Sequence, residues 1–168
     1  ATVHMETKVD NIDYDKKIVY AKDKDGKEIQ ESYDKLVLAT GSQPILPDIE
    51  GMDLENVQKV KIFQDAQSVI DKINHEEIKK VVVVGAGYIG TELAEAFKRL
   101  GKESTLIEHG DTVLRGYYDD KFCKKMEDNL RDHGVNLVFN EEVVKLEGTD
   151  GKVNKVITDK GEYDCDMV

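Results

Sequence analysis

Three glycines and one acid form the clearest chemical pattern in the sequence. Gly85, Gly87 and Gly90 make a GxGxxG segment directly after four valines, and Glu108 lies 23 positions beyond Gly85. Gly85 would allow a tight turn out of a strand, Gly87 a close approach of the backbone to a pyrophosphate, and Gly90 close packing of a helix on the strand. The helix that begins there directs unpaired N–H groups and the positive end of its dipole at the phosphates. A structural turn is the alternative, but the order strand, glycines, helix, strand and acid favours a dinucleotide site.

Glu108 also predicts which dinucleotide is preferred. A carboxylate at the end of the second strand accepts hydrogen bonds from ribose hydroxyls and repels a 2′-phosphate. His109 follows Glu108, and the first arginine downstream is Arg115, so no strongly basic residue adjoins the acid. We therefore expect NADH to bind better than NADPH. The motif alone leaves nicotinamide and flavin dinucleotides open, because both use this fold.

The elements around this pattern predict an α/β fold with a Rossmann-like domain. Strands are expected at Val81–Val84, Ser104–Glu108 and Val135–Phe139, with a hairpin at 143–158 and a last strand at 163–168. Gly101 and Gly134 should end the two intervening helices. The residues expected to face the sheet are Ile89, Leu93, Ala96, Phe97 and Leu100 in the first helix and Phe122, Met126 and Leu130 in the second.

The residues before the valine run indicate a β-rich segment followed by a connection and a helix. Strands are expected near 3–9, 17–21 and 27–33, with an Asp-Gly turn between the last two. The apolar run Leu36–Ala39 is typical of a strand covered on both faces. Both prolines fall in the connection that follows, and apolar spacing predicts a helix at Phe63–Ile73.

Composition limits the possible partners and the compartment. The 168 residues are 35% charged and 39% hydrophobic, and the net charge of −11 argues against nucleic-acid and anionic-membrane partners. No apolar run is long enough to span a bilayer, and we expect no signal peptide in the first residues, which lack a basic and an apolar region. Cys123 and Cys165 form neither a CxxC pair nor a zinc site, so we assign no catalytic or metal-ligating residue and expect buried thiols in a reducing cytoplasm.

Three segments together resemble a known family. Ser32–Pro44 (SYDKLVLATGSQP), Val81–Phe97 (VVVVGAGYIGTELAEAF) and Gly116–Phe122 (GYYDDKF) are similar to segments of the flavin-dependent pyridine nucleotide–disulfide oxidoreductases. The resemblance points to the branch that contains NADH oxidase, NADH peroxidase and coenzyme A–disulfide reductase, and it covers nearly the whole chain.

The resemblance implies roles for individual residues. Tyr88 would be an aromatic gate over the flavin, and Glu92 would reach toward the nicotinamide pocket. Glu108 would bind the ribose, and Tyr117 would pack on the adenine. Read without the family, Tyr88 is a half-buried ring at a helix start, Glu92 is a solvated acid, and Tyr117 and Tyr118 could be core residues. The implied NADH site comprises Gly85, Gly87, Tyr88, Ile89, Gly90, Glu92, Glu108 and Tyr117, and the implied secondary FAD contacts are Ala39, Thr40 and Gly41.

The sequence departs from the family in ways that suggest an internal fragment. It contains no first FAD-binding glycine motif, no redox-active cysteine at a matching position, and no later FAD segment or dimerisation domain. We expect residues 1–50 to be part of a flavin domain, 51–78 a connection, and 79–168 an NAD-binding domain truncated at its end. The homo-oligomeric parent would pass hydride from NADH to FAD and on to oxygen, while the fragment alone should be inactive. A peroxidase or coenzyme A–disulfide reductase fragment, a non-catalytic NAD-binding module and a purely structural domain are the alternatives.

Overall fold

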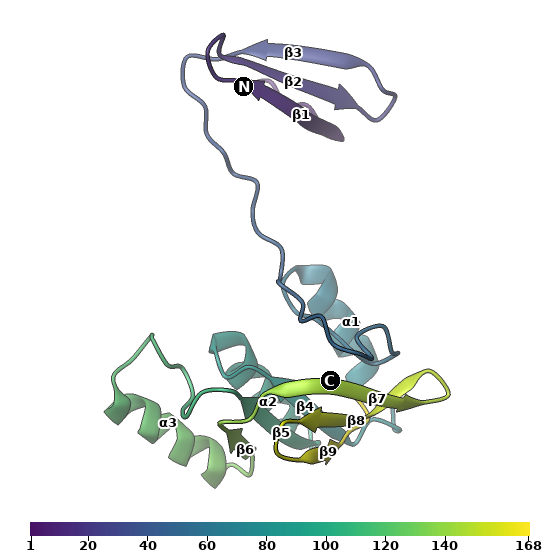
Figure 1. Ribbon diagram of the computed structural model, residues 1–168, viewed down its shortest axis with the longest axis vertical. Helices are drawn as coiled ribbons and strands as arrows, with labels where there is room; N and C mark the ends of the chain where they lie inside the picture. The colour runs from purple at the N-terminus through teal and green to yellow at the C-terminus, as the bar shows by residue number, and fades with distance from the viewer. The chain divides into compact units, whose positions relative to one another are not determined.

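The computed structural model describes all 168 residues, which divide into two compact units, Ala1–Ser42 and Gln43–Val168. Each unit has its own sheet or sheets (Figure 1). None of the helices has the length and apolar character that crossing a bilayer requires.

The first unit is a three-stranded antiparallel sheet in the order β1-β2-β3. The strands are β1 (Thr7–Asp13), β2 (Ile18–Asp23) and β3 (Glu28–Ser32). The predicted Asp-Gly turn joins β2 to β3: the Asp23 carboxylate accepts hydrogen bonds from the backbone N–H groups of Asp25 and Lys27, and Gly26 has a φ of +82°. No side chain of this unit is buried.

The strand predicted at Leu36–Ala39 is wrong. These residues have no regular secondary structure, and Val37 and Leu38 are 83% and 62% exposed. An apolar run becomes a covered strand only where neighbouring strands supply hydrogen-bond partners and other layers cover its faces. In this unit the last such partner is Lys17, whose carbonyl accepts a hydrogen bond from Tyr33 N–H.

The second unit is built on a parallel sheet in the order β4-β5-β6. Its strands are β4 (Lys80–Val84), β5 (Glu103–Glu108) and β6 (Asn136–Phe139), and the helices α2 (Tyr88–Arg99) and α3 (Asp120–Asp132) connect them. A further helix, α1 (Phe63–Ile73), precedes β4 with the predicted bounds. Gly101 and Gly134 follow α2 and α3 with φ values of +79° and +82°, which confirms their predicted role at the helix ends.

An antiparallel sheet forms a third layer. It contains β7 (Val143–Thr149), β8 (Lys152–Thr158) and β9 (Glu162–Asp164), and Figure 1 shows it on one side of the parallel sheet. The predicted last strand is divided: after β9 the chain crosses to the parallel sheet, where Met167 pairs with Val81 and its carbonyl accepts a hydrogen bond from Val82 N–H.

The alternation of side chains along the parallel strands creates two cores. Val81, Val83 and Leu106 pack with the helices, whereas Val82 and Ile107 point to the opposite face and pack against the antiparallel sheet. The parallel sheet is therefore covered on both faces, which explains why β4 is a continuous run of valines rather than an alternating pattern.

The predicted helix faces are partly wrong. In α2, Ile89 and Leu100 are about half exposed, and Gly90, Thr91, Ala94 and Phe97 are the buried residues. Gly90 must lie close to Gly85, so the small residues on this side of α2 face the sheet together with Phe97, and Ile89 and Leu100 are left outside the contact. In α3, Phe122 and Met126 are exposed, while Cys123, Glu127 and Leu130 face the interior.

Candidate functional site

The glycine-rich turn leaves β4 and opens α2. Gly85 donates a hydrogen bond from its N–H to the Ile107 carbonyl at 2.8 Å and has a φ of +98°, a conformation that favours glycine. Gly87 is the N-cap of α2. A Cβ at Gly90 would lie 1.8 Å from the Gly85 carbonyl oxygen, whereas a Cβ at Gly87 would meet no protein atom within 4 Å. Gly85 and Gly90 thus shape the turn, and Gly87 faces open space.

The start of α2 is suited to an anion. Its N-cap makes no side-chain hydrogen bond, and its first turn contains no acid. By contrast, Asp119 caps α3 by accepting from Phe122 N–H. The first N–H groups of α2 therefore have no side-chain acceptor, and the helix dipole places positive potential at this point.

Ala86, between the first two glycines, is held from two sides. Its N–H donates to Glu108 Oε2 at 2.7 Å, and its carbonyl accepts from Leu114 N–H at 2.8 Å. The first contact comes from the end of β5 and the second from the loop between β5 and α3, which we call the β5–α3 loop (residues 109–119). The conformation of the turn is consequently fixed by two other parts of the chain.

Glu108 has a structural contact in addition to its predicted ligand role. Besides Ala86, its carboxylate accepts a hydrogen bond from Gly110 N–H at 2.9 Å and lies 2.8 Å from His109 Nδ1. The side chain of Glu108 is 13% exposed, and that of His109 is 84% exposed. A carboxylate has about four acceptor positions, so a ribose hydroxyl can still bind, particularly where the exposed imidazole moves away.

Three tyrosines gather beside the turn. The ring centroids of Tyr88 and Tyr117 are 4.4 Å apart, and the Tyr88 hydroxyl donates to the Tyr118 hydroxyl at 2.9 Å. This hydrogen bond is the main cause of the raised pKa of Tyr88. The three tyrosine residues are 44% to 58% exposed, so Tyr117 and Tyr118 are not core residues. The roles predicted for Tyr88 and Tyr117 belong to opposite ends of the dinucleotide, yet the structure places these side chains in contact.

Most of the predicted NADH-site residues line one hollow of about 600 Å³. The hollow lies between α1, β4 and the start of α2. The predicted residues that line it are Gly85, Gly87, Tyr88, Ile89, Gly90 and Tyr117.

Glu92 lines a different groove of the second unit, and the three FAD-contact residues belong to the first unit. Glu92 lines a separate groove of about 540 Å³ between α2 and α3, together with Tyr88 and Tyr118. Ala39, Thr40 and Gly41 belong to the first unit, where Ala39 and Thr40 line a hollow beside β1 and Gly41 has a φ of +71°. Within the second unit, neither Glu92 nor Glu108 is among the residues that line the hollow at the glycine-rich turn, although the Glu108 carboxylate reaches that turn at Ala86.

Both cysteines are free and buried, as predicted. Burial raises the pKa of the Cys165 thiol to about 12, so this sulfur is a neutral thiol near pH 7 and a poor nucleophile.

We expect neither cysteine to react with a thiol reagent in the folded protein. Ellman's reagent at pH 7.5 should label fewer than about 0.1 thiols per chain within minutes, because both sulfurs are buried and the Cys165 thiolate is scarce. In denaturant both thiols should react. Rapid labelling of the folded protein at either position would contradict the buried environments described above.

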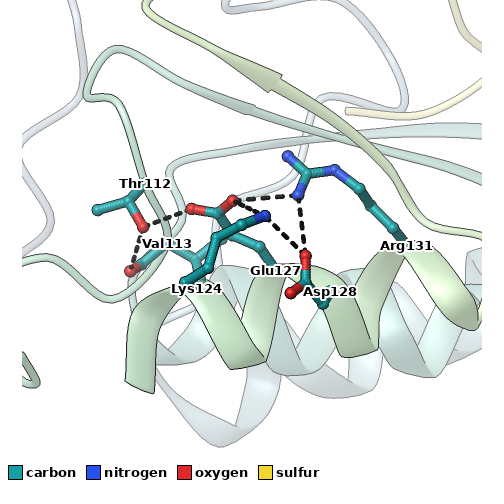
Figure 2. Close-up of polar contacts among 6 residues, drawn as sticks. All are labelled: Thr112, Val113, Lys124, Glu127, Asp128 and Arg131. Atoms are coloured by element: carbon teal, nitrogen blue, oxygen red, sulfur yellow. Dashed lines mark hydrogen bonds and ion pairs between the residues drawn. The ribbon is translucent and has the colours of Figure 1, made fainter. Parts of the chain in front are cut away.

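Sequence reasoning missed three residues that hold the β5–α3 loop. Figure 2 shows Glu127 of α3 between Thr112 on one side and the basic side chains of Lys124 and Arg131 on the other. Leu114 is the third residue, buried and with a φ of +54°. The spacing of Cys123, Glu127 and Leu130 on one helix face was the available signal, but Glu127 reads as a solvated acid when the sequence is considered alone.

The parallel sheet, its glycine-rich turn at a helix start and the acid at the end of the next strand define a Rossmann-like dinucleotide-binding domain. Comparison with known proteins narrows this class. The model of the pyridine nucleotide-disulphide oxidoreductase family matches residues 1–168. The chain belongs to this family, as the resemblance in its sequence indicated.

The relatives include NADH oxidases. One from Streptococcus pyogenes serotype M6 is 52% identical over the whole chain, which spans 39% of that protein. A CoA-dependent NAD(P)H sulfur oxidoreductase from Pyrococcus abyssi is 40% identical over 99% of the chain, which spans 36% of it. Among solved structures, a water-forming NADH oxidase from Lactobacillus brevis bound to NADH superposes with a TM-score of 0.84 at 39% identity, covering 96% of this chain and 35% of that one.

Proposed function

We propose that the chain is the NADH-binding portion of an FAD-dependent NADH oxidase. The observation that carries the proposal is the turn at Gly85–Gly90. It combines an uncapped helix start, an open approach at Gly87 and a carboxylate, Glu108, at the end of β5. The similar NADH oxidases, one of them bound to NADH, support this assignment.

Different residues would bind the adenosine and the nicotinamide halves of NADH. The N–H groups at the start of α2 would hold the pyrophosphate, Glu108 would bind the adenosine ribose, and Tyr117 would pack on the adenine. Tyr88 and Glu92 would act on the nicotinamide side, where Tyr88 has to leave its contact with Tyr118 before a nicotinamide ring can enter. In this proposal residues 79–168 bind NADH and residues 51–78 form the connection to them.

FAD would contact Ala39, Thr40 and Gly41 within residues 1–50. When bound, the flavin supplies the redox chemistry, accepting hydride from NADH and passing electrons to oxygen. The residues of this chain would bind and orient NADH for that transfer. No redox-active cysteine is proposed here, because Cys123 and Cys165 are both buried. Two free thiols suit a reducing compartment, and we propose that the enzyme is cytoplasmic. We also propose that the full-length parent enzyme is a homo-oligomer.

A sulfur-compound reductase is the second candidate function. The observation that favours it is the 40% identity with the CoA-dependent NAD(P)H sulfur oxidoreductase. The glycine-rich turn and Glu108 would serve both enzymes in the same way, because each begins by binding the reduced nicotinamide cofactor.

Titration of the purified chain with NADH tests the proposal. We expect saturable binding by isothermal titration calorimetry, with weaker binding of NADPH because its 2′-phosphate would approach Glu108. A chain that remains folded but shows no saturable binding at millimolar NADH would overturn the proposal and favour a purely structural domain.

A further inference from the structure

We propose that Thr112 and Glu127 position the β5–α3 loop against the glycine-rich turn and thereby set the affinity for the adenosine half of NADH. The inference rests on the proposed function and adds to it two positioning residues that are not expected to touch the cofactor.

Glu127 is an acid that α3 turns toward the interior. Its side chain is 9% exposed, in contrast with 57% for Asp128 beside it. Its Oε1 accepts a hydrogen bond from the Thr112 hydroxyl at 2.6 Å, while Oε2 lies 3.0 Å from Arg131 Nη1 and 3.6 Å from Lys124 Nζ. An ionised carboxylate in such a position needs partners on both oxygens, and one of those partners comes from outside the helix.

Thr112 is that partner, and it lies in the β5–α3 loop. Among the contacts drawn in Figure 2, the bond from Thr112 to Glu127 is the one that joins α3 to this loop. The ion pairs of Asp128 with Lys124 and Arg131 remain within the helix. The network therefore has an inner part that holds the loop and an outer part that belongs to α3 alone.

Leu114, two residues after Thr112, contacts the glycine-rich turn. Val113 is fully buried, and Leu114, 4% exposed, donates its N–H to the Ala86 carbonyl at 2.8 Å. Leu114 has a φ of +54°, a conformation that non-glycine residues adopt only when surrounding contacts impose it. Thr112 on one side and Ala86 on the other are contacts that can impose it.

The same loop carries groups for the adenosine side. Tyr117 N–H donates to the Leu114 carbonyl at 3.1 Å, so the ring proposed to pack on adenine depends on the position of Leu114. Arg115, next to Leu114, forms an ion pair with Asp111 that keeps its guanidinium within the loop. Loosening the loop at Thr112 would thus displace Tyr117 and release Ala86, and both changes would weaken binding of the ADP-ribose part of NADH.

Thr112→Val tests the proposal because it removes one hydroxyl and leaves Glu127 paired with Arg131 and Lys124. We expect the Kd for NADH and that for ADP-ribose to rise together by roughly three- to tenfold, the effect of one hydrogen bond. The Leu114 amide should exchange with solvent faster by a similar factor in hydrogen-exchange measurements. Thr112→Ser, which retains the hydroxyl, should restore both properties.

Asp128→Asn is the matched control, since it disturbs the outer part of the network without touching Thr112. It should leave both Kd values within about twofold. The proposal is overturned if the Thr112→Val variant binds NADH and ADP-ribose as tightly as the unsubstituted chain does, or if Asp128→Asn weakens binding as much as Thr112→Val. Failure of the unsubstituted chain to bind NADH would instead count against the proposed function, so the two failures are distinguishable.

Discussion

Replacing Gly87 with valine is expected to abolish most NADH binding while the protein stays folded. A valine side chain at this N-cap would fill the open space that the pyrophosphate needs, and an overlap of this kind weakens binding by roughly ten- to a hundredfold. The backbone φ of −76° is accessible to valine, and Cβ meets no protein atom. The free energy of unfolding should fall by only about 1 kcal/mol, the usual cost of an unfavourable N-cap. Calorimetric titration and urea denaturation measure the two quantities.

Gly90→Val is the matched comparison, and its main effect should be on the free energy of unfolding rather than on ligand space. Its Cβ would overlap the Gly85 carbonyl oxygen, which is backbone and cannot move aside without displacing the turn. We expect a loss of about 3 kcal/mol in the free energy of unfolding. If Gly87→Val unfolds the protein while Gly90→Val does not, the assignment of ligand space to Gly87 and packing to Gly90 is wrong.

Glu108→Gln is expected to change the choice between NADH and NADPH. The uncharged amide makes a weaker hydrogen bond with the ribose, and it no longer repels a 2′-phosphate. We expect the ratio of the NADPH Kd to the NADH Kd to fall by roughly a hundredfold, about tenfold from each effect. Affinities for both cofactors should be measured at one low ionic strength, because salt screens the repulsion.

Asp111→Asn provides a second test of the preference for NADH over NADPH. The ion pair with Asp111 occupies Arg115 and raises the pKa of its guanidinium. Releasing this side chain should improve NADPH binding and leave NADH binding unchanged, since Glu108 is intact. An unaltered ratio in Glu108→Gln would mean that this carboxylate serves only to hold Ala86.

The second unit followed closely from local sequence signals. The bounds of α1 and the glycines at the ends of α2 and α3 depend on apolar spacing and on backbone conformations that glycine adopts most readily. The strands expected at Val81–Val84 and Ser104–Glu108 are also present, as β4 and β5. These features are encoded within a few residues of where they occur.

The remaining errors concern contacts between distant segments. Leu36–Ala39 has the composition of a covered strand, but its first-unit neighbours supply neither further strand pairing nor a covering layer. The buried face of α2 is set by Gly90 packing on Gly85, which no count of apolar residues would reveal. The contact of Tyr88 with Tyr117 and Tyr118, and the inward turn of Glu127, depend on how the β5–α3 loop folds back. Periodicity within one segment contains no information about such long-range contacts.

The two hydrogen bonds on Ala86 have a thermodynamic consequence. A flexible glycine-rich loop would lose conformational entropy on binding a dinucleotide, and that loss would subtract from the affinity. Here Glu108 and Leu114 already restrict the residue between the first two glycines before any ligand arrives. Most of this conformational entropy is therefore lost during folding rather than on binding, and the turn is preorganised for its ligand. Its affinity for a pyrophosphate should accordingly exceed what the few N–H groups at the start of α2 would give in a mobile loop.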